Sequence, residues 1–189
     1  MRDLGFYVMW RGIKFFLDMM AVASHDHAFT AAGVRQALFE FQKKHIFPGD
    51  DFREVLVFAD GGLKTKETLF IFFQLAQEMR MDFNIHYFAP YHGHSEVDGH
   101  FGAGKTVLRH AAKDGPVKSN EEIRNAFSSL PSTTVVGLTI EKFRFKVTPM
   151  KDQIRKWFEW KFTSEGAVFC RALSLQGEWT QQEMIWAEV

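Results

Sequence analysis

Apolar residues near the start of the chain form two short runs, at 5–10 and 13–20, which a two-residue segment joins. The joining residues are Arg11 and Gly12, and a glycine between two β-prone runs is typical of a tight hairpin turn. The first part of the chain is therefore predicted to be a β-hairpin.

After the hairpin, apolar residues recur at the spacing of one face of an amphipathic helix. Ala31, Val34, Leu38 and Phe41 follow this spacing and predict a helix over about 28–44. Short continuous apolar runs, which indicate buried strands, then alternate with further helical spacing. The predicted elements are a strand at 55–58, a helix at 66–81, a strand at 84–89, helices at 95–112 and 120–129, and a strand at 133–140. Strands and helices in this order predict a mixed α/β layer fold.

The pattern changes after residue 140, where positive charges are interleaved with aromatic residues. Residues 141–161 hold seven Lys and Arg against three Asp and Glu, a surplus of four positive charges. Two apolar runs flank the segment 164–166, which predicts a second hairpin. We therefore expect an α/β domain at 1–140 and a small, basic, β-containing appendage at 141–189. The charges and rings of this appendage fit either a solvated face or a surface that binds nucleic acid.

The composition restricts the class of protein further. The chain has 189 residues, of which 46% are hydrophobic, so it can form a folded core. Lys and Arg number 23, as do Asp and Glu, which argues against an overall basic coat protein for nucleic acid. A single cysteine, Cys170, excludes an internal disulfide, and the longest apolar stretch, 68–75, is too short to cross a membrane. We therefore expect a soluble intracellular protein with no membrane partner, nuclear if its source is a eukaryote.

Two aspartates follow strands at positions where α/β sheets bind ligands. Asp60 comes directly after the run at 55–58, and Asp98 opens the helix that follows the next strand. Because neighbouring parallel strands expose their carboxyl ends at one edge of a sheet, both carboxylates can meet there and hold a divalent metal ion. The structural alternative is that Asp60 starts an Asp-Gly turn and Asp98 caps a helix.

The sequence around these aspartates resembles the catalytic core of DDE-type transposases and retroviral-like integrases. The resemblance rests on Val57-Phe-Ala-Asp-Gly-Gly62 and on Tyr87-Phe-Ala-Pro-Tyr-His-Gly-His-Ser-Glu-Val-Asp-Gly-His-Phe101, and it covers about residues 5–140. It implies a ribonuclease H-like fold, in which helices flank a mixed sheet, and a transposon-derived protein. The ancestor would have catalysed DNA strand transfer.

The resemblance also assigns roles to individual residues. Asp60 and Asp98 match the second and third acidic residues of the family, which implies that they are catalytic and bind Mg²⁺ or Mn²⁺. DNA is the implied partner. The residues expected to contact it are His94, Lys105, Arg109 and Lys113.

One part of the family pattern is missing. The family's first catalytic aspartate lies on a leading strand before the hairpin, and neither Asp3 nor Asp18 occupies that position. We therefore expect a domain that lacks the leading strand and has lost most of its strand-transfer activity, because one carboxylate fewer holds the metal pair weakly. The alternative on the same fold is a non-catalytic DNA-binding or interaction protein. An unpaired strand edge could also join copies of the chain into a homo-oligomer.

Two other patterns compete for the same segment. Gly99–Thr106 fits the Walker A formula for nucleotide binding, but a P-loop needs a strand that runs directly into it, and the nearest predicted strand ends at residue 89. Histidines also gather here and could bind zinc, although their spacing matches no standard zinc site. These histidines are His86, His92, His94 and His100.

Overall fold

The computed structural model describes residues 1–22, 27–46, 50, 52–59, 63–88, 95–140, 145–147, 154–172, 177–183 and 186–188. The chain forms two compact units, each made of two separate stretches of sequence. The first unit is Met1–Ile46 with His94–Glu141, and the second is Phe47–Gly93 with Lys142–Val189. The described part of the chain contains two mixed sheets and four α-helices, which confirms the predicted mixed α/β class.

The sheet of the first unit is built on the predicted hairpin, which the structure confirms. β1 (Arg2–Trp10) and β2 (Ile13–Ala21) pair antiparallel along their whole length. β5 (Thr133–Gly137) joins β2 in parallel, so the strand order is β1-β2-β5. Both faces of β2 are buried from Leu17 to Ala21, which makes it the central strand of this unit.

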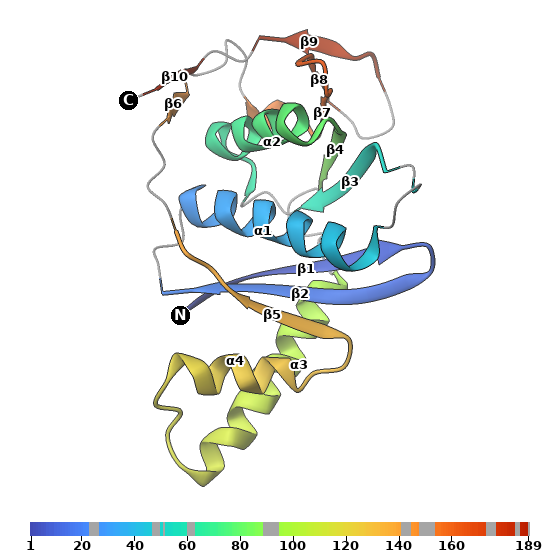
Figure 1. The fold of residues 1–189 in the computed structure, drawn as a ribbon. Helices are drawn as coiled ribbons and strands as arrows, with labels where there is room; N and C mark the ends of the chain where they lie inside the picture. Colours follow the sequence, from blue (N-terminus) through green and yellow to red (C-terminus); the bar gives the residue numbers. More distant parts are fainter. Residues whose placement is uncertain are drawn as a thin grey trace. The chain divides into compact units, whose positions relative to one another are not determined.

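Helices cover both faces of this sheet, as Figure 1 shows. α1 (His27–His45) packs on the face that carries Leu4, whose side chain fills the space beside Gly33. α3 (Glu96–Ala111) and α4 (Asn120–Ser128) lie on the opposite face, and the 3₁₀ turn η2 (Ala112–Asp114) continues α3. The helices predicted from apolar spacing are therefore confirmed within one or two residues.

The second unit contains the parallel strands β3 (Glu54–Ala59) and β4 (Asp82–Tyr87), which α2 (Lys66–Met79) connects. β7 (Glu159–Phe162), β8 (Val168–Arg171) and β9 (Thr180–Gln182) extend this sheet in the order β3-β4-β7-β8-β9. α2 covers one face of the sheet, where the ring of Phe72 lies 5.8 Å from that of Phe83 and 6.5 Å from that of Phe162.

Three strands of the C-terminal segment, β7, β8 and β9, belong to the same sheet as β3 and β4. The predicted second hairpin exists as β7 and β8, but β7 pairs antiparallel with β4 and so continues the sheet of the second unit. The sequence does not reveal this pairing because strand partners far apart in the chain leave no local pattern. A short 3₁₀ turn, η3 (Ile154–Lys156), precedes β7, and β6 (Phe145–Val147) pairs with β10 (Trp186–Glu188). The boundary between the domains expected at 1–140 and 141–189 stays a prediction.

None of the described helices combines the length and the hydropathy that crossing a bilayer requires.

Two glycines of α3 allow the contact between α3 and α4 to be tested with a matched pair of variants. A Cβ atom on Gly104 would lie 2.4 Å from the Phe127 ring, whereas a Cβ on the exposed Gly102 would meet nothing within 4 Å. Gly104→Ala is expected to lower the free energy of unfolding by about 1–3 kcal/mol, because the ring must move. Gly102→Ala is expected to raise it by about 0.5–1 kcal/mol, because alanine favours the helix. Urea unfolding measures both, and equal effects of the two substitutions would contradict the packing of α3 on α4.

Candidate nucleic-acid interface

The start of α3 is fixed by its first residues. Ser95 is the extended N-cap residue, and its backbone N–H and its hydroxyl both donate to Oδ2 of Asp98, at 2.8 and 3.1 Å. Asp98 therefore forms one half of a capping box, in which the third helical residue binds back to the cap. The carboxylate expected to hold a metal ion has a structural role, as the alternative interpretation of this residue predicts.

A buried polar pair joins α3 to the sheet. Oδ2 of Asp18, on β2, lies 2.7 Å from Nε2 of His100, and the two side chains are 0% and 3% exposed. Phe16, two residues before Asp18, stacks on the imidazole with 4.1 Å between ring centres. Because a buried carboxylate is costly without a hydrogen-bond donor, this pair determines where α3 can sit on the sheet.

The helix also approaches the sheet closely at one glycine. Gly5 lies opposite Asp18 in the β1–β2 ladder, and a Cβ there would be 2.8 Å from the Phe101 ring and 3.2 Å from Oδ1 of Asp18. The absence of a side chain at this position lets α3 rest against the backbone of β1.

A second carboxyl group lies on the same face of the hairpin. Asp3 is two residues before Gly5, and both of its oxygens, like Oδ1 of Asp18, are buried without a hydrogen-bond partner of normal geometry in the described structure. Burial and, to a smaller extent, the charge of Asp18 together raise the pKa of Asp3 to about 7, while the hydrogen bond of the Leu4 amide opposes the shift. Burial also raises the pKa of Asp18, which the hydrogen bond and the charge of His100 oppose. The site thus favours a protonated Asp3 in slightly acidic solution.

The exposed surface of α3 and η2 carries a line of positive charges. Lys105, Arg109 and Lys113 are exposed and follow each other at intervals of four residues along α3 and η2. Residues at this interval lie on one side of a helix. None of the three has an ion-pair partner among the residues that the structure describes. We call this line of three residues the basic stripe.

The other sequence-based site predictions have different outcomes. Asp60 and His94 lie outside the described residues, so the expected meeting of Asp60 with Asp98 and the expected DNA contact of His94 stay predictions. Within the described ranges, no group of three or more His, Cys, Asp or Glu residues could hold a metal ion. Gly99–Thr106 lies entirely inside α3, whereas a P-loop requires these residues in a loop before the helix.

The second unit has a groove on the face of its sheet away from α2. The groove has a volume of about 430 Å³, and its lining includes Phe58, His86, Glu159 and Trp179. Nε2 of His86 lies 3.5 Å from Oε1 of Glu159, whose Oε2 accepts a 2.5 Å hydrogen bond from Nε of Arg171. His86 thus has an acidic neighbour on the sheet.

A lysine of the second unit has an unusual setting. The ammonium group of Lys64 lies 4.0 Å from the centre of the Phe158 ring and 5.5 Å from that of Tyr87. Burial lowers the pKa of Lys64 to about 8. The sequence gives no signal for this setting, because the two rings come from β4 and from the segment before β7.

The pairing of Asp18 with His100 is a feature that the sequence interpretation missed. The two residues are 82 positions apart, and no local pattern connects them. One signal was present: Asp18 is the single acidic residue in the apolar run 13–20. A charged residue in a run that otherwise indicates a buried strand implies a buried partner.

Comparisons with known proteins give no relative: no family model, no curated protein and no solved structure matches the chain.

The carboxyl group of Asp3 predicts how stability depends on pH. Its folded-state pKa of about 7 exceeds the unfolded value of 3.8. At pH values between these two, the carboxyl group is protonated in the folded chain and ionised in the unfolded chain. Asp3 therefore lowers the free energy of unfolding as the pH rises through this window, by at most about 1.4 kcal/mol per pH unit. Asp3→Asn should remove this contribution, so that the variant gains stability relative to the wild type between about pH 4 and pH 8.

Urea unfolding at several pH values provides the measurement. Glu96→Gln, which removes a carboxyl group at an exposed position of α3, is the matched control. A constant difference between the Asp3→Asn variant and the wild type would show that Asp3 is ionised in the folded protein.

Proposed function

We propose that the protein binds duplex DNA through the basic stripe of α3 and η2, and that it descends from a DDE-type transposase or integrase. The observation that carries the binding proposal is the basic stripe itself. Three exposed cations follow one another along α3 and η2, and the hydrogen bond between His100 and Asp18 fixes α3 to the sheet. A function on DNA would place the protein in the nucleus in a eukaryote.

The spacing of the basic stripe suits a polyphosphate. Four residues of helix rise by about 6 Å, since each residue rises about 1.5 Å. Along one strand of DNA, each phosphate lies about 3.4 Å further along the duplex axis than the one before it. Every second phosphate is therefore displaced by about 7 Å along this axis. Lys105 and Arg109 of α3 can therefore meet phosphates of one strand, and Lys113 follows them in the 3₁₀ turn η2.

The surrounding charge favours the same partner. Residues 99–118 contain Lys105, Arg109, Lys113 and Lys118 against Asp114 alone, a surplus of three positive charges. The acidic residues of α3, Glu96 and Asp98, stand in its first turn, at the end opposite to the basic stripe. Positive potential on this part of the unit would attract DNA and give its binding a strong dependence on salt.

The order of elements supports descent from the ribonuclease H-like family. β3 and β4 are parallel, α2 connects them, and α3 follows β4. Asp60 comes directly after β3 in the sequence, and Asp98 lies in the first turn of α3. These are the places where the family carries its second and third acidic residues. The family's single mixed sheet differs from the described structure, in which β3 and β4 belong to one sheet and β1, β2 and β5 to another.

The DNA-binding proposal predicts the effect of removing the basic stripe. Replacing Lys105, Arg109 and Lys113 together by glutamine should weaken duplex binding equally for unrelated sequences. It should also reduce the slope of log K against log salt by up to about 2.7, because each phosphate contact contributes about 0.9. Fluorescence anisotropy with labelled duplexes at several salt concentrations measures both quantities.

Three cations of α1, on the other face of the sheet, provide a control with the same change in net charge. Replacing Arg35, Lys43 and Lys44 by glutamine should leave the salt slope close to that of the wild type. If this control loses as much affinity as the variant of the basic stripe, the assignment of the interface to α3 is wrong.

DNA strand transfer is the second candidate function, and the sequence around Asp60 and Asp98 favours it. The described residues do not complete a site for Mg²⁺ or Mn²⁺, and Oδ2 of Asp98 accepts two hydrogen bonds from Ser95. No catalytic step can therefore be derived from this geometry.

The two candidate functions differ in their response to one substitution. Asp60→Ala should abolish strand transfer if the protein is an enzyme, because a metal ligand is lost, and should leave duplex affinity unchanged if it only binds DNA. A strand-transfer assay with Mg²⁺ and Mn²⁺, run beside the binding assay, separates them. Transfer by the wild type that Asp60→Ala removes would establish the enzyme; unchanged binding without transfer is the result we expect.

A further inference from the structure

The tip of the β1–β2 hairpin projects past the rest of its sheet. β5 pairs with β2 only from Phe16 to Met20, so the six residues from Met9 to Lys14 belong to a two-stranded ribbon. Arg11 and Gly12 form the turn with φ angles of 46° and 82°. Two consecutive positive φ values define the two-residue turn that matches the twist of the strands, so the tip is short and well defined. We call residues Met9–Lys14 the hairpin tip.

One face of the ribbon is fixed to α1. The Trp10 ring meets the Phe41 ring edge-on at 5.9 Å, and Phe15 stacks on Phe41 at 6.2 Å and on His45 at 4.4 Å. These contacts hold the ribbon against the last turns of α1. The hairpin tip is therefore a supported projection rather than a free arm.

The exposed side chains of the hairpin tip combine apolar and cationic groups. Met9 and Ile13 are 65% and 48% exposed, and Lys14, directly opposite Met9 in the ladder, is exposed as well. Arg11 is exposed at the turn, and no acidic residue occurs between Met9 and Lys14. Exposed apolar groups flanked only by cations fit a partner that is anionic on its outside and apolar within.

We propose that the hairpin tip enters the minor groove of the DNA that α3 binds, where Met9 wedges against a base step and Arg11 and Lys14 contact phosphates. This inference rests on the proposed function. Proteins that bend DNA insert Met, Leu, Ile or Phe between base steps in this way, and the base planes partly unstack. The strands of the ribbon and the cations beside Met9 supply the support and the charge that such a wedge needs.

The side chains of the hairpin tip favour DNA over an anionic membrane surface. Membrane-binding tips present Trp and Tyr to the interface between lipid and water. Here the Trp10 ring packs on Phe41, and the guanidinium of Arg11 lies 5.3 Å from its centre. The apolar groups that remain exposed, Met9 and Ile13, are of the size that fits between neighbouring base pairs.

The experiment uses the full chain and a duplex that carries 2-aminopurine at its centre and a fluorophore at each end. Binding of the wild type should raise the 2-aminopurine emission, because the base unstacks. It should also bring the two ends of the duplex closer together, which increases the energy transfer between the two fluorophores. Met9→Ser should lose most of both signals while its affinity falls less than tenfold. Met9→Leu, which keeps an apolar wedge, should retain them.

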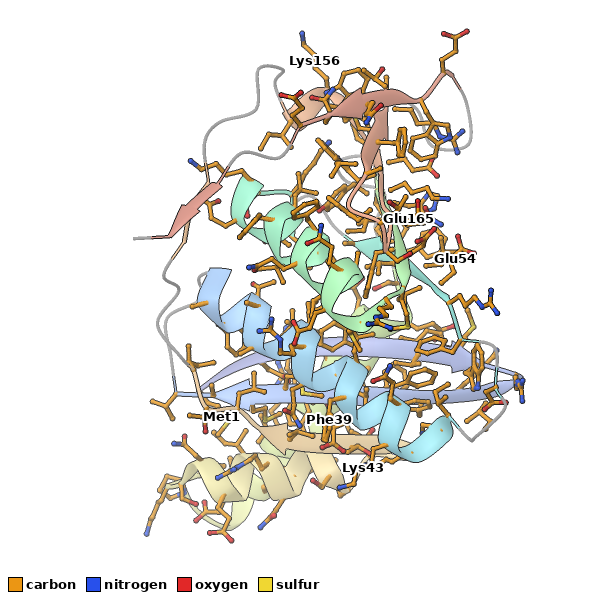
Figure 2. All side chains as sticks on the ribbon, turned by 45° about the horizontal axis from the view of Figure 1, so that its top comes forward. Met1, Phe39, Lys43, Glu54, Lys156 and Glu165 are labelled. Carbon is orange, nitrogen blue, oxygen red and sulfur yellow. The ribbon has the colours of Figure 1, made fainter. Side chains whose placement is uncertain are left out.

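Phe39 provides the matched control. It is 54% exposed on the outer side of α1, away from the turn, and Phe39→Ser removes an exposed apolar group of similar size (Figure 2). This variant should bend and unstack DNA as the wild type does. If Phe39→Ser loses the two signals to the same extent as Met9→Ser, the effect is not specific to the hairpin tip and the proposal is overturned.

The outcomes separate this inference from the proposed function. Wild-type binding that depends on the basic stripe but leaves the duplex straight and stacked would overturn the wedge and leave DNA binding intact. Bending that depends on Met9 while the variant of the basic stripe binds normally would support the wedge and overturn the role of α3. Sedimentation with phosphatidylserine vesicles is the further arm: binding to vesicles that Met9→Ser abolishes, without DNA bending, would overturn the proposal in favour of a membrane.

Discussion

The first unit depends on the buried hydrogen bond between Asp18 and His100. It connects the central strand of the sheet with the middle of α3, across 82 residues of sequence, and both side chains are almost fully buried. Removing one partner of a buried hydrogen bond costs about 1–3 kcal/mol in proteins, because the remaining polar group stays buried without a partner. The contacts around the pair, namely the stacking of Phe16 on the imidazole and the approach of Phe101 to Gly5, require α3 to be in this one position.

The same pair fixes the register of the sheet. β2 is buried on both faces along its second half, so apolar packing alone would tolerate a shift of one residue. Such a shift would turn Asp18 toward α1, where it would meet the apolar side that carries Leu4 instead of His100. A polar residue in a strand that is buried among apolar residues on both faces can therefore select one register. Buried polar groups have this effect in other proteins, at some cost in stability.

Local features of the structure could be predicted from the sequence, and long-range ones could not. The hairpin follows from two apolar runs around Arg11-Gly12, and the helices follow from apolar spacing, because these patterns involve neighbouring residues. The exposure of the basic stripe follows from its residue types, since Lys and Arg are mostly exposed, and the cap of α3 follows from Ser95 and Asp98. The parallel pairing of β2 with β5 and the addition of β7 to β4 depend on contacts between distant segments. The pairing of Asp18 with His100 was missed for the same reason.

The charges of the first unit explain how a chain with no net charge can carry a local surplus of positive charge on α3 and η2. Its carboxyl groups on this face of the sheet are withdrawn from solvent: Asp18 is hydrogen-bonded to His100, and burial favours a protonated Asp3 below about pH 7. Asp98, at the start of α3, accepts hydrogen bonds from Ser95. The cations of the basic stripe have no comparable partners among the described residues. Because screening limits surface charges to a range of about 10 Å, the local surplus of positive charge determines which partner approaches α3, and the overall balance of the chain has little influence on it.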